Sequence, residues 1–258
     1  MSFDRFVAIG DSFTQGVGDA DPARPQGWRG WADRVAEVLA THNPNFRYAN
    51  LATSGAQTHH ILGHQLEPAL ALRPDLVSVH AGGNDLIRPK VDIDKLVAGI
   101  GAAVDEFRAQ GATVIMFTQG DGGSSGVFGA IRGRVAIFNE LVRDFIADGP
   151  LGPEGIVLVD NWRLKDGHDL RVWADDRLHL NSIGHQGVAI NVLNTLGIEH
   201  DLVPYALPDG PPKSRRQQRA EDLAWARNHL APWVGRRLRR AAPDLTGAAK
   251  YPTLTPLA

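Results

Sequence analysis

The chain has 258 residues and no cysteine, so it can form no disulfide, no cysteine-ligated metal site and no cysteine nucleophile. Its 27 Lys and Arg residues nearly balance 29 Asp and Glu residues, and the net charge of −2 predicts no general affinity for nucleic acid. The first residues lack the basic start and apolar stretch of a secretory signal, and no apolar run is long enough to span a membrane, so a cytoplasmic protein is expected.

Short apolar runs alternate along the chain with longer segments of helical period. The runs are residues 6–9, 48–51, 76–79, 114–117 and 156–159. Apolar residues at helical spacing occur between them, for example in residues 31–39, 61–70 and 137–145. This alternation predicts an α/β fold in which helices cover both faces of a parallel sheet. Because ligands bind beyond the carboxyl ends of the strands in such sheets, the residues that follow each strand are the first candidates for a site.

The residues at these positions are those that acyl transfer requires. Ser12 follows the first predicted strand, Gly55 the second and Asn84 the third, while Asp176 and His179 precede the last helical stretch. A serine hydroxyl becomes a nucleophile when an imidazole takes its proton and a carboxylate orients that imidazole. We therefore assign attack to Ser12, proton transfer to His179 and orientation to Asp176. The backbone N–H groups of Ser12 and Gly55 and the side-chain amide of Asn84 are the candidate donors of an oxyanion hole.

Four short blocks carry a resemblance to a known family. Gly10-Asp11-Ser12, Gly55, Gly82-Gly83-Asn84-Asp85 and Asp176-Arg177-Leu178-His179 resemble, in order, the conserved blocks of the GDSL or SGNH hydrolases. The resemblance implies a flavodoxin-like three-layer α/β/α sandwich, and the five apolar runs predict that its central parallel sheet has five strands. It also implies ester hydrolysis through a serine acyl-enzyme, with no metal and no other cofactor. The family name has leucine where this chain has Phe13, a residue that we expect to pack behind the turn without changing the chemistry.

Simpler interpretations exist for several of these residues. Asp11 is expected to be a turn residue, and Asp85 the cap of the next segment. Asp175 is an alternative to its neighbour Asp176, but the three-residue spacing to His179 favours Asp176. The pattern Gly122-Gly123-Ser124-Ser125-Gly126 matches a nucleophile elbow, but its composition is typical of a flexible loop, which borders the substrate or is simply solvated.

Two further patterns suggest cofactors and are not favoured. His60 and His64 share a helical face with Glu67, but a catalytic zinc needs three protein ligands and no glutamate lies between the two histidines, so an exposed polar face is the better interpretation. Gly16-Val17-Gly18 lacks the third glycine of a dinucleotide fingerprint and does not directly follow a strand. We predict no metal and no cofactor.

The carboxyl-terminal part differs in composition from the rest. We expect a hydrolase domain over residues 1–200, and a proline-rich linker with a basic helical extension over residues 201–258. Residues 213–240 contain nine basic and two acidic residues, a net charge of +7, which leaves −9 for the remainder. A basic amphipathic helix can lie on an anionic membrane, but Pro232 and Gly235 interrupt this one. A helix packed on the acidic main domain is therefore favoured over membrane contact.

The sequence thus predicts a serine esterase or lipase-type hydrolase that acts on small-molecule carboxylic esters. Trp28 and Phe128, each in a loop near the predicted site, are candidates for the acyl pocket. Acyl transfer to an alcohol and removal of acetyl groups from carbohydrates are alternatives on the same residues. A non-catalytic protein that docks on membrane or nucleic acid through its basic extension is the alternative from another class.

Overall fold

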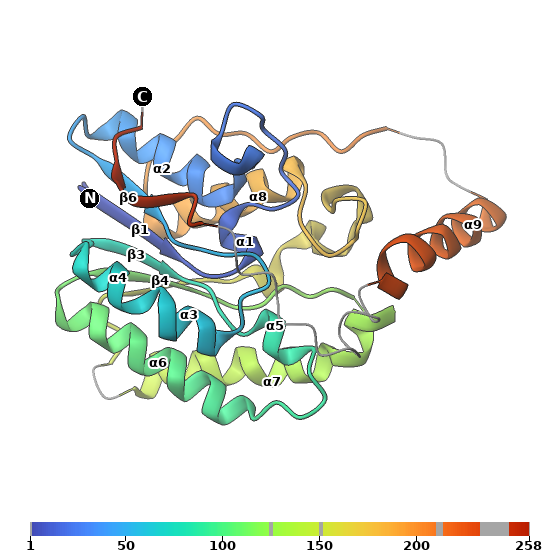
Figure 1. The fold of residues 1–258 in the computed structure, drawn as a ribbon, viewed down its shortest axis with the longest axis horizontal. Helices are drawn as coiled ribbons and strands as arrows, with labels where there is room; N and C mark the ends of the chain where they lie inside the picture. The colour runs from blue at the N-terminus through green and yellow to red at the C-terminus, as the bar shows by residue number, and fades with distance from the viewer. Residues whose placement is uncertain (1, 124–125, 150–151, 210–213, 233–247, 258) are drawn as a thin grey trace.

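The computed structural model describes residues 2–123, 126–149, 152–209, 214–232 and 248–257 (Figure 1). Its strands are β1 (Arg5–Ile9), β2 (Arg47–Asn50), β3 (Leu76–Val79), β4 (Thr113–Phe117), β5 (Ile156–Val159) and β6 (Tyr251–Thr255). In the described part of the chain they form a six-stranded sheet with the order β5-β4-β3-β1-β2-β6. The first five strands are mutually parallel, which confirms the predicted fold class.

Helices cover both faces of this sheet. The α-helices of the described residues are α1 (Ser12–Gln15), α2 (Gly30–His42), α3 (Thr58–His64), α4 (Leu66–Ala71), α5 (Gly83–Leu86), α6 (Ile93–Ala109), α7 (Gly126–Asp148), α8 (Ser182–Leu196) and α9 (Arg215–Trp225). Helices α2 and α8 lie on one face, and α3, α4, α6 and α7 lie on the other, while α9 lies to the side (Figure 1). No helix in the described ranges is both long enough and apolar enough to cross a membrane.

The alternation of side chains along the strands produces two apolar cores. Val7 and Ile9 of β1 pack in the core beneath α3, α4, α6 and α7. Phe6 and Ala8 point to the opposite face and pack with α2 and α8. Both faces of the central strands are covered, which explains why these strands are largely apolar in the sequence.

The sixth strand corrects the prediction of five. β6 pairs antiparallel with β2, with Tyr48 opposite Thr255 and Asn50 opposite Tyr251. It comes from the segment that we expected to be a helical extension, and it contains Pro252. An edge strand tolerates proline because one side of it has no partner to receive a backbone N–H. The division of the chain at residue 200 stays a prediction.

A buried ion pair fastens β6 to the main domain. Lys250 Nζ lies 2.6 Å from Asp33 Oδ2 and donates a hydrogen bond to the Arg29 carbonyl oxygen at 3.0 Å. The Tyr48 hydroxyl donates to the other oxygen of Asp33 at 3.0 Å. Burial raises the pKa of Asp33 to about 6, although Lys250 favours the ionised carboxylate. Two charges are stable at this depth only because each is paired and hydrogen-bonded.

The strand order positions the candidate site. β1 lies between β2 and β3. The chain therefore runs from β1 to β2 on one side, and then crosses back over β1 to reach β3 and β4 on the other side. In doubly wound sheets, ligands bind at the carboxyl ends of the strands where the order reverses in this way. Ser12 follows β1 and Asn84 follows β3, so both lie at this position.

Candidate active site

Ser12 is the first residue of α1, directly after the end of β1. Asp11 caps the helix, because its Oδ1 accepts a hydrogen bond from the Phe13 backbone N–H at 3.0 Å. Gly16 ends the helix in a left-handed conformation with φ of 92°. Phe13 packs behind the turn, with its ring centroid 5.6 Å from that of Trp31, as we expected. The Ser12 side chain remains partly exposed and is held at the edge of the sheet.

Asn84 connects the loops that follow the first three strands. Its Nδ2 donates to Asp11 Oδ2 at 3.1 Å and to the Ala56 carbonyl oxygen at 3.0 Å. Ala56 comes directly after Gly55, which adopts a left-handed conformation with φ of 74°. The structure therefore brings Asn84, Gly55 and the residue before Ser12 together. In the described residues, the backbone N–H groups of Ser12 and Gly55 donate to no other protein group.

Asp85 supports the start of a helix, but this helix is α3, which precedes Asp85 in the chain, and not the next segment that we expected. Its Oδ2 accepts hydrogen bonds from both the backbone N–H and the hydroxyl of Thr58, each at 2.9 Å. Thr58 begins α3, where the side chain of the cap residue Gln57 makes no capping hydrogen bond. Asp85 therefore holds the start of α3 against the short helix α5, which also carries Asn84.

Asp176 and His179 form a compact hydrogen-bonded turn. Asp176 Oδ2 lies 2.6 Å from His179 Nδ1, while Oδ1 accepts from the backbone N–H groups of Leu178 at 2.9 Å and His179 at 3.0 Å. Burial acts to raise the pKa of Asp176, but the hydrogen bonds from the His179 ring and from the backbone outweigh burial and hold the pKa at about 2. The carboxylate is therefore ionised at neutral pH and can orient the ring. Asp175 is exposed.

The turn that carries His179 packs on the loop that follows α1. A Cβ atom at Gly18 would lie 3.0 Å from His179 Cβ and only 2.3 Å from the Leu180 carbonyl oxygen. Only glycine therefore allows the two segments to approach this closely. The φ of 101° at Gly18 is a second reason for glycine, because residues with a side chain rarely adopt it. The contact brings the Asp176–His179 pair next to the helix of Ser12, although no hydrogen bond joins Ser12 to His179 in the described residues.

Several buried polar residues that support the site were not identified from the sequence. Gln65 interrupts the predicted helix between α3 and α4, and its side chain bonds both the N–H (2.8 Å) and the carbonyl (2.9 Å) of Gly10. Asp19 pairs with Arg34 of α2 and accepts from the Gly30 N–H at 3.0 Å. Arg34 lies three residues after Trp31 on the core face of its helix. A charge at an apolar position was the signal that could have revealed this pair.

A buried histidine also supports the loop after α1. His185 of α8 accepts a hydrogen bond from the Trp31 backbone N–H at Nδ1, 3.2 Å away, and its Nε2 lies 3.4 Å from the Val17 carbonyl oxygen. Burial lowers the pKa of His185 to about 4, so the ring is neutral at neutral pH. Its role is to hold the segment between Ser12 and α2.

The two aromatic pocket candidates lie in different surroundings. Phe128 lies in the first turn of α7, and its ring centroid is 6.1 Å from that of Trp173, which precedes the His179 turn. Trp28 is partly buried and pairs through its backbone with Ala20. Ser124 lies outside the described residues. Phe128 and Trp173 thus form an aromatic pair, and Trp173 also pairs through its backbone with Leu180, the residue after His179. Trp173 was not identified from the sequence.

Among the described residues, the histidines on α3 are not joined by other side chains that could complete a metal site. The ring centroids of His60 and His64 are 6.4 Å apart. In the described part of the chain, no group of three or more His, Asp or Glu side chains is placed to hold a metal ion.

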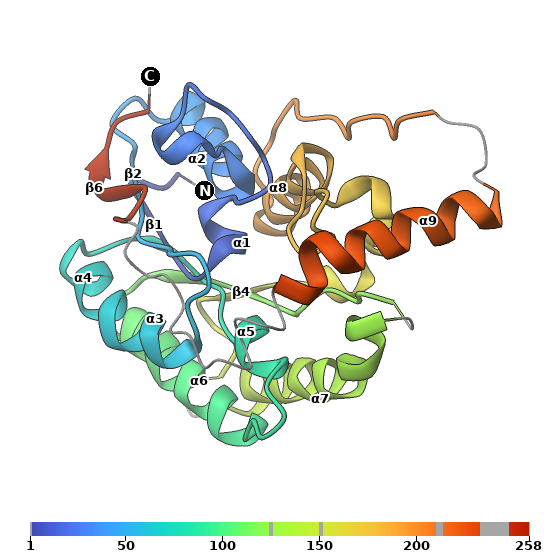
Figure 2. The same cartoon turned by 45° about the vertical axis from the view of Figure 1, so that its right-hand side comes forward.

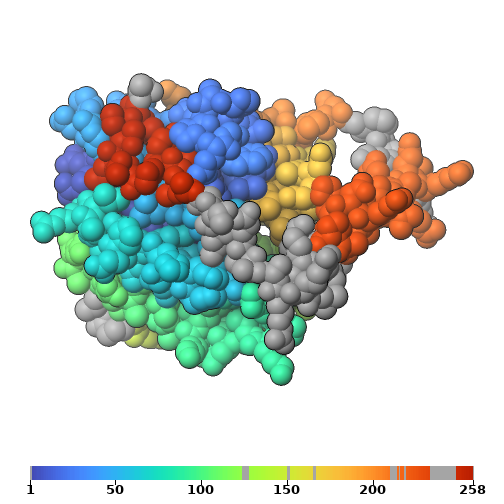
Figure 3. All heavy atoms as spheres, in the orientation of Figure 1, coloured from blue at the N-terminus to red at the C-terminus, as the bar shows by residue number. Residues whose placement is uncertain are grey.

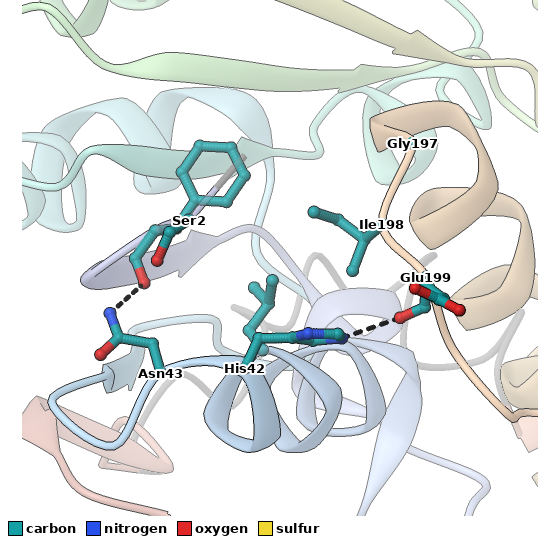
Figure 4. Close-up of a pocket in the computed structure, with 8 residues that line it drawn as sticks. Ser2, His42, Asn43, Gly197, Ile198 and Glu199 are labelled. Carbon is teal, nitrogen blue, oxygen red and sulfur yellow. Dashed lines mark hydrogen bonds between the residues drawn. The ribbon is translucent and has the colours of Figure 1, made fainter.

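A cavity of about 250 Å³ lies at the other end of the sheet (Figure 4). Phe3, His42 and Ile198 line it, and the His42 ring lies 2.8 Å from the Glu199 carbonyl oxygen. Phe3 precedes β1, whereas Ser12 follows it, so this cavity is separate from the candidate active site.

Comparison with known proteins identifies the family. The model of the GDSL-like lipase/acylhydrolase family matches residues 8–186. The chain belongs to this family. It is therefore a hydrolase of the esterase type. No curated protein matches it.

Solved structures of esterases and lipases share the fold. Axe2, an acetylxylan esterase from Geobacillus stearothermophilus, is 24% identical with a TM-score of 0.62, covering 77% of this chain and 96% of Axe2. LAE5, an α/β hydrolase from the metagenome of Lake Arreo, Spain, is 22% identical with a TM-score of 0.61, covering 76% and 96%. The lipase Lip_vut3 from a goat rumen metagenome is 18% identical with a TM-score of 0.60, covering 74% and 97%.

Proposed function

We propose that this GDSL-family protein hydrolyses carboxylic esters through an acyl-enzyme on Ser12. The observation that carries the proposal is the packing of the hydrogen-bonded Asp176–His179 turn on the loop directly after the Ser12 helix. This packing supplies a hydroxyl and an oriented imidazole at one edge of the sheet. With its Nδ1–H directed to Asp176, the His179 ring keeps Nε2 available to accept a proton.

The reaction proceeds in two stages. Ser12 Oγ attacks the ester carbonyl carbon while its proton passes to His179, and the alcohol then leaves with that proton. Water next attacks the acyl-enzyme, giving a proton to His179, and the acid is released as Ser12 regains its proton. An alcohol in place of water in the second stage would give acyl transfer, which remains the alternative on the same site.

The oxyanion that forms in each stage is assigned to three donors. The Ser12 and Gly55 backbone N–H groups have no protein acceptor in the described residues, which supports this role. Asn84 donates to Asp11 and to Ala56 in the structure without substrate. We infer that one of these N–H groups turns to the oxyanion, while the other bond keeps the amide in place.

Active-site labelling tests the proposal. A fluorophosphonate probe should modify Ser12, and the Ser12→Ala variant should lose both labelling and hydrolysis of p-nitrophenyl acetate while it remains folded. Labelling at Ser124, or activity of the variant equal to that of the wild type, would contradict the assignment. A folded wild-type protein without labelling or hydrolysis would favour the non-catalytic alternative.

The substrate can be narrowed with the same assay. Acetylated xylo-oligosaccharides are a natural first choice, because Axe2 is an acetylxylan esterase. A chain-length series of esters should show whether Phe128 and Trp28 line the acyl pocket. If acyl-chain preference is unchanged when both are replaced by alanine, the pocket lies elsewhere.

A further inference from the structure

Helix α9 lies outside the family match and yet contacts the His179 turn. The match ends at residue 186, whereas α9 spans Arg215–Trp225. In two views α9 lies beside the segment of residues 160–181, on the side to which the parallel strands point (Figures 1 and 2). The space-filling view shows the atoms of α9 against this segment (Figure 3).

Three interactions join α9 to the turn. Trp225 Nε1 donates a hydrogen bond to the Asp176 carbonyl oxygen at 2.8 Å. Arg177 Nη1 lies 2.7 Å from Asp222 Oδ1. The Arg177 guanidinium also lies 5.2 Å from the centre of the Trp225 ring, within the range of a cation–π contact. All three interactions act on two consecutive residues, one of which is the candidate orienting carboxylate.

The turn needs external support because its backbone is unfavourable. Arg177 adopts a left-handed conformation with φ of 53°, which costs free energy in any residue with a Cβ atom. Such conformations persist where several surrounding contacts hold the backbone in place. Trp225 and Asp222 supply contacts of this kind. They act on the backbone that directs the Asp176 carboxylate to His179.

We propose that Trp225 is a positioning residue for the Asp176–His179 pair, so that the extension beyond the family domain sets the efficiency of the active site. This inference rests on the proposed function of Ser12, His179 and Asp176. The indole N–H fixes the Asp176 carbonyl, and the ring fixes Arg177. Together these two contacts keep the Asp176 carboxylate oriented while His179 takes the proton from Ser12 and later returns it.

The test separates the indole hydrogen bond from the bulk of the side chain. Trp225→Phe removes the N–H and keeps an aromatic ring over Arg177. It should lower kcat about fivefold, the effect of one lost hydrogen bond, with KM changed less than about twofold. Trp225→Ala should lower kcat further. Leu223→Ala, on the same helix at a side chain that is 72% exposed, is the matched control and should leave kcat unchanged.

A second variant shows whether the effect passes through Asp176. In an Asp176→Ala background, Trp225→Phe should have no further effect on kcat, because the residue to be positioned is absent. Unchanged kcat in the Trp225→Phe single variant would overturn the inference. An effect confined to KM or to acyl-chain preference would also overturn it, since α9 would then line the substrate pocket. If Ser12→Ala loses activity, the proposed function stands whatever the Trp225 variants show. Each of the two proposals can therefore fail without the other.

Discussion

Replacement of Gly18 by alanine tests whether the Ser12 helix and the His179 turn form one site. A Cβ atom at Gly18 would lie 2.3 Å from the Leu180 carbonyl oxygen, and real Cβ atoms essentially never approach closer than 3.0 Å. The two segments must therefore separate by at least about 0.7 Å. The obstacle is backbone, which cannot move aside without carrying His179 with it.

The expected loss of activity follows from this displacement. A misplacement of about 1 Å in a catalytic group can cost about 10²-fold in rate. We expect Gly18→Ala to lower kcat/KM for p-nitrophenyl acetate by about 10- to 100-fold. The left-handed backbone of Gly18 adds about 1–2 kcal/mol of strain in a residue with a side chain, so the variant should also unfold at a lower temperature.

Gly27 provides a matched control in the same loop. Its φ is 75°, and a Cβ atom there would meet nothing within 4 Å. Gly27→Ala should therefore lose stability through backbone strain while its kcat/KM stays close to that of the wild type. If the two variants lose activity equally, or if neither does, the packing of Gly18 on the His179 turn does not position the catalytic groups.

Three further outcomes follow from the geometry. Asn84→Ala should lower kcat about 10²–10³-fold as an oxyanion donor is lost; a change in KM alone would mean that Asn84 only binds substrate. Because the folded pKa of Asp176 lies near 2, below its ordinary 3.8, its contribution to stability is present above pH 3.8 and is lost as the pH falls toward 2. Thermal unfolding of Asp176→Asn should accordingly depend less on pH in this window, and an unchanged pH dependence would contradict the assigned hydrogen bonds. Lys250→Met should lower the free energy of unfolding by about 3–5 kcal/mol, because Asp33 is left buried without its cation; denaturant unfolding measures this, and a loss below about 1 kcal/mol would show that the pair is not buried in solution.

Much of the fold could be predicted because its signals are local. Most of the first five strands are largely apolar, since both faces of a parallel sheet are covered. β2 is the exception, because only Tyr48 and Ala49 of its four residues are apolar. The blocks around Ser12, Gly55 and Asn84 were also recognisable, because each follows a predicted strand directly. Once β1 is known to lie between β2 and β3, the carboxyl ends of these strands must bring the three blocks together.

The parts that could not be predicted depend on contacts between distant residues. β6 is a short edge strand that contains proline, so its residues show no strand pattern until β2 is available as a partner. Gln65 fits the helical pattern of its segment, yet its buried side chain is hydrogen-bonded to Gly10, 55 positions away. The contact of Trp225 with Asp176 spans 49 positions. Spacing and periodicity contain no information about such pairs.

Among the described residues, two contacts of the carboxyl-terminal segment with the hydrolase domain lead to the candidate site. Trp225 holds the Asp176 turn directly. Lys250 pairs with Asp33, which accepts from Tyr48, and the Tyr48 hydroxyl in turn accepts from Asn50 Nδ2 at 2.9 Å. Asn50 also donates to the carbonyl oxygen of Thr14, within the Ser12 helix, at 2.9 Å.

These two routes start from residues beyond the family match, which ends at residue 186. One reaches the residues proposed to move the proton, and the other reaches the helix that carries the proposed nucleophile. A domain cut at residue 200 would retain every proposed catalytic residue but would leave Asp33 buried without Lys250 and Asp176 without Trp225. Because an unpaired buried charge is costly and a misplaced catalytic group is slow, such a fragment should be less stable and less active than the full chain.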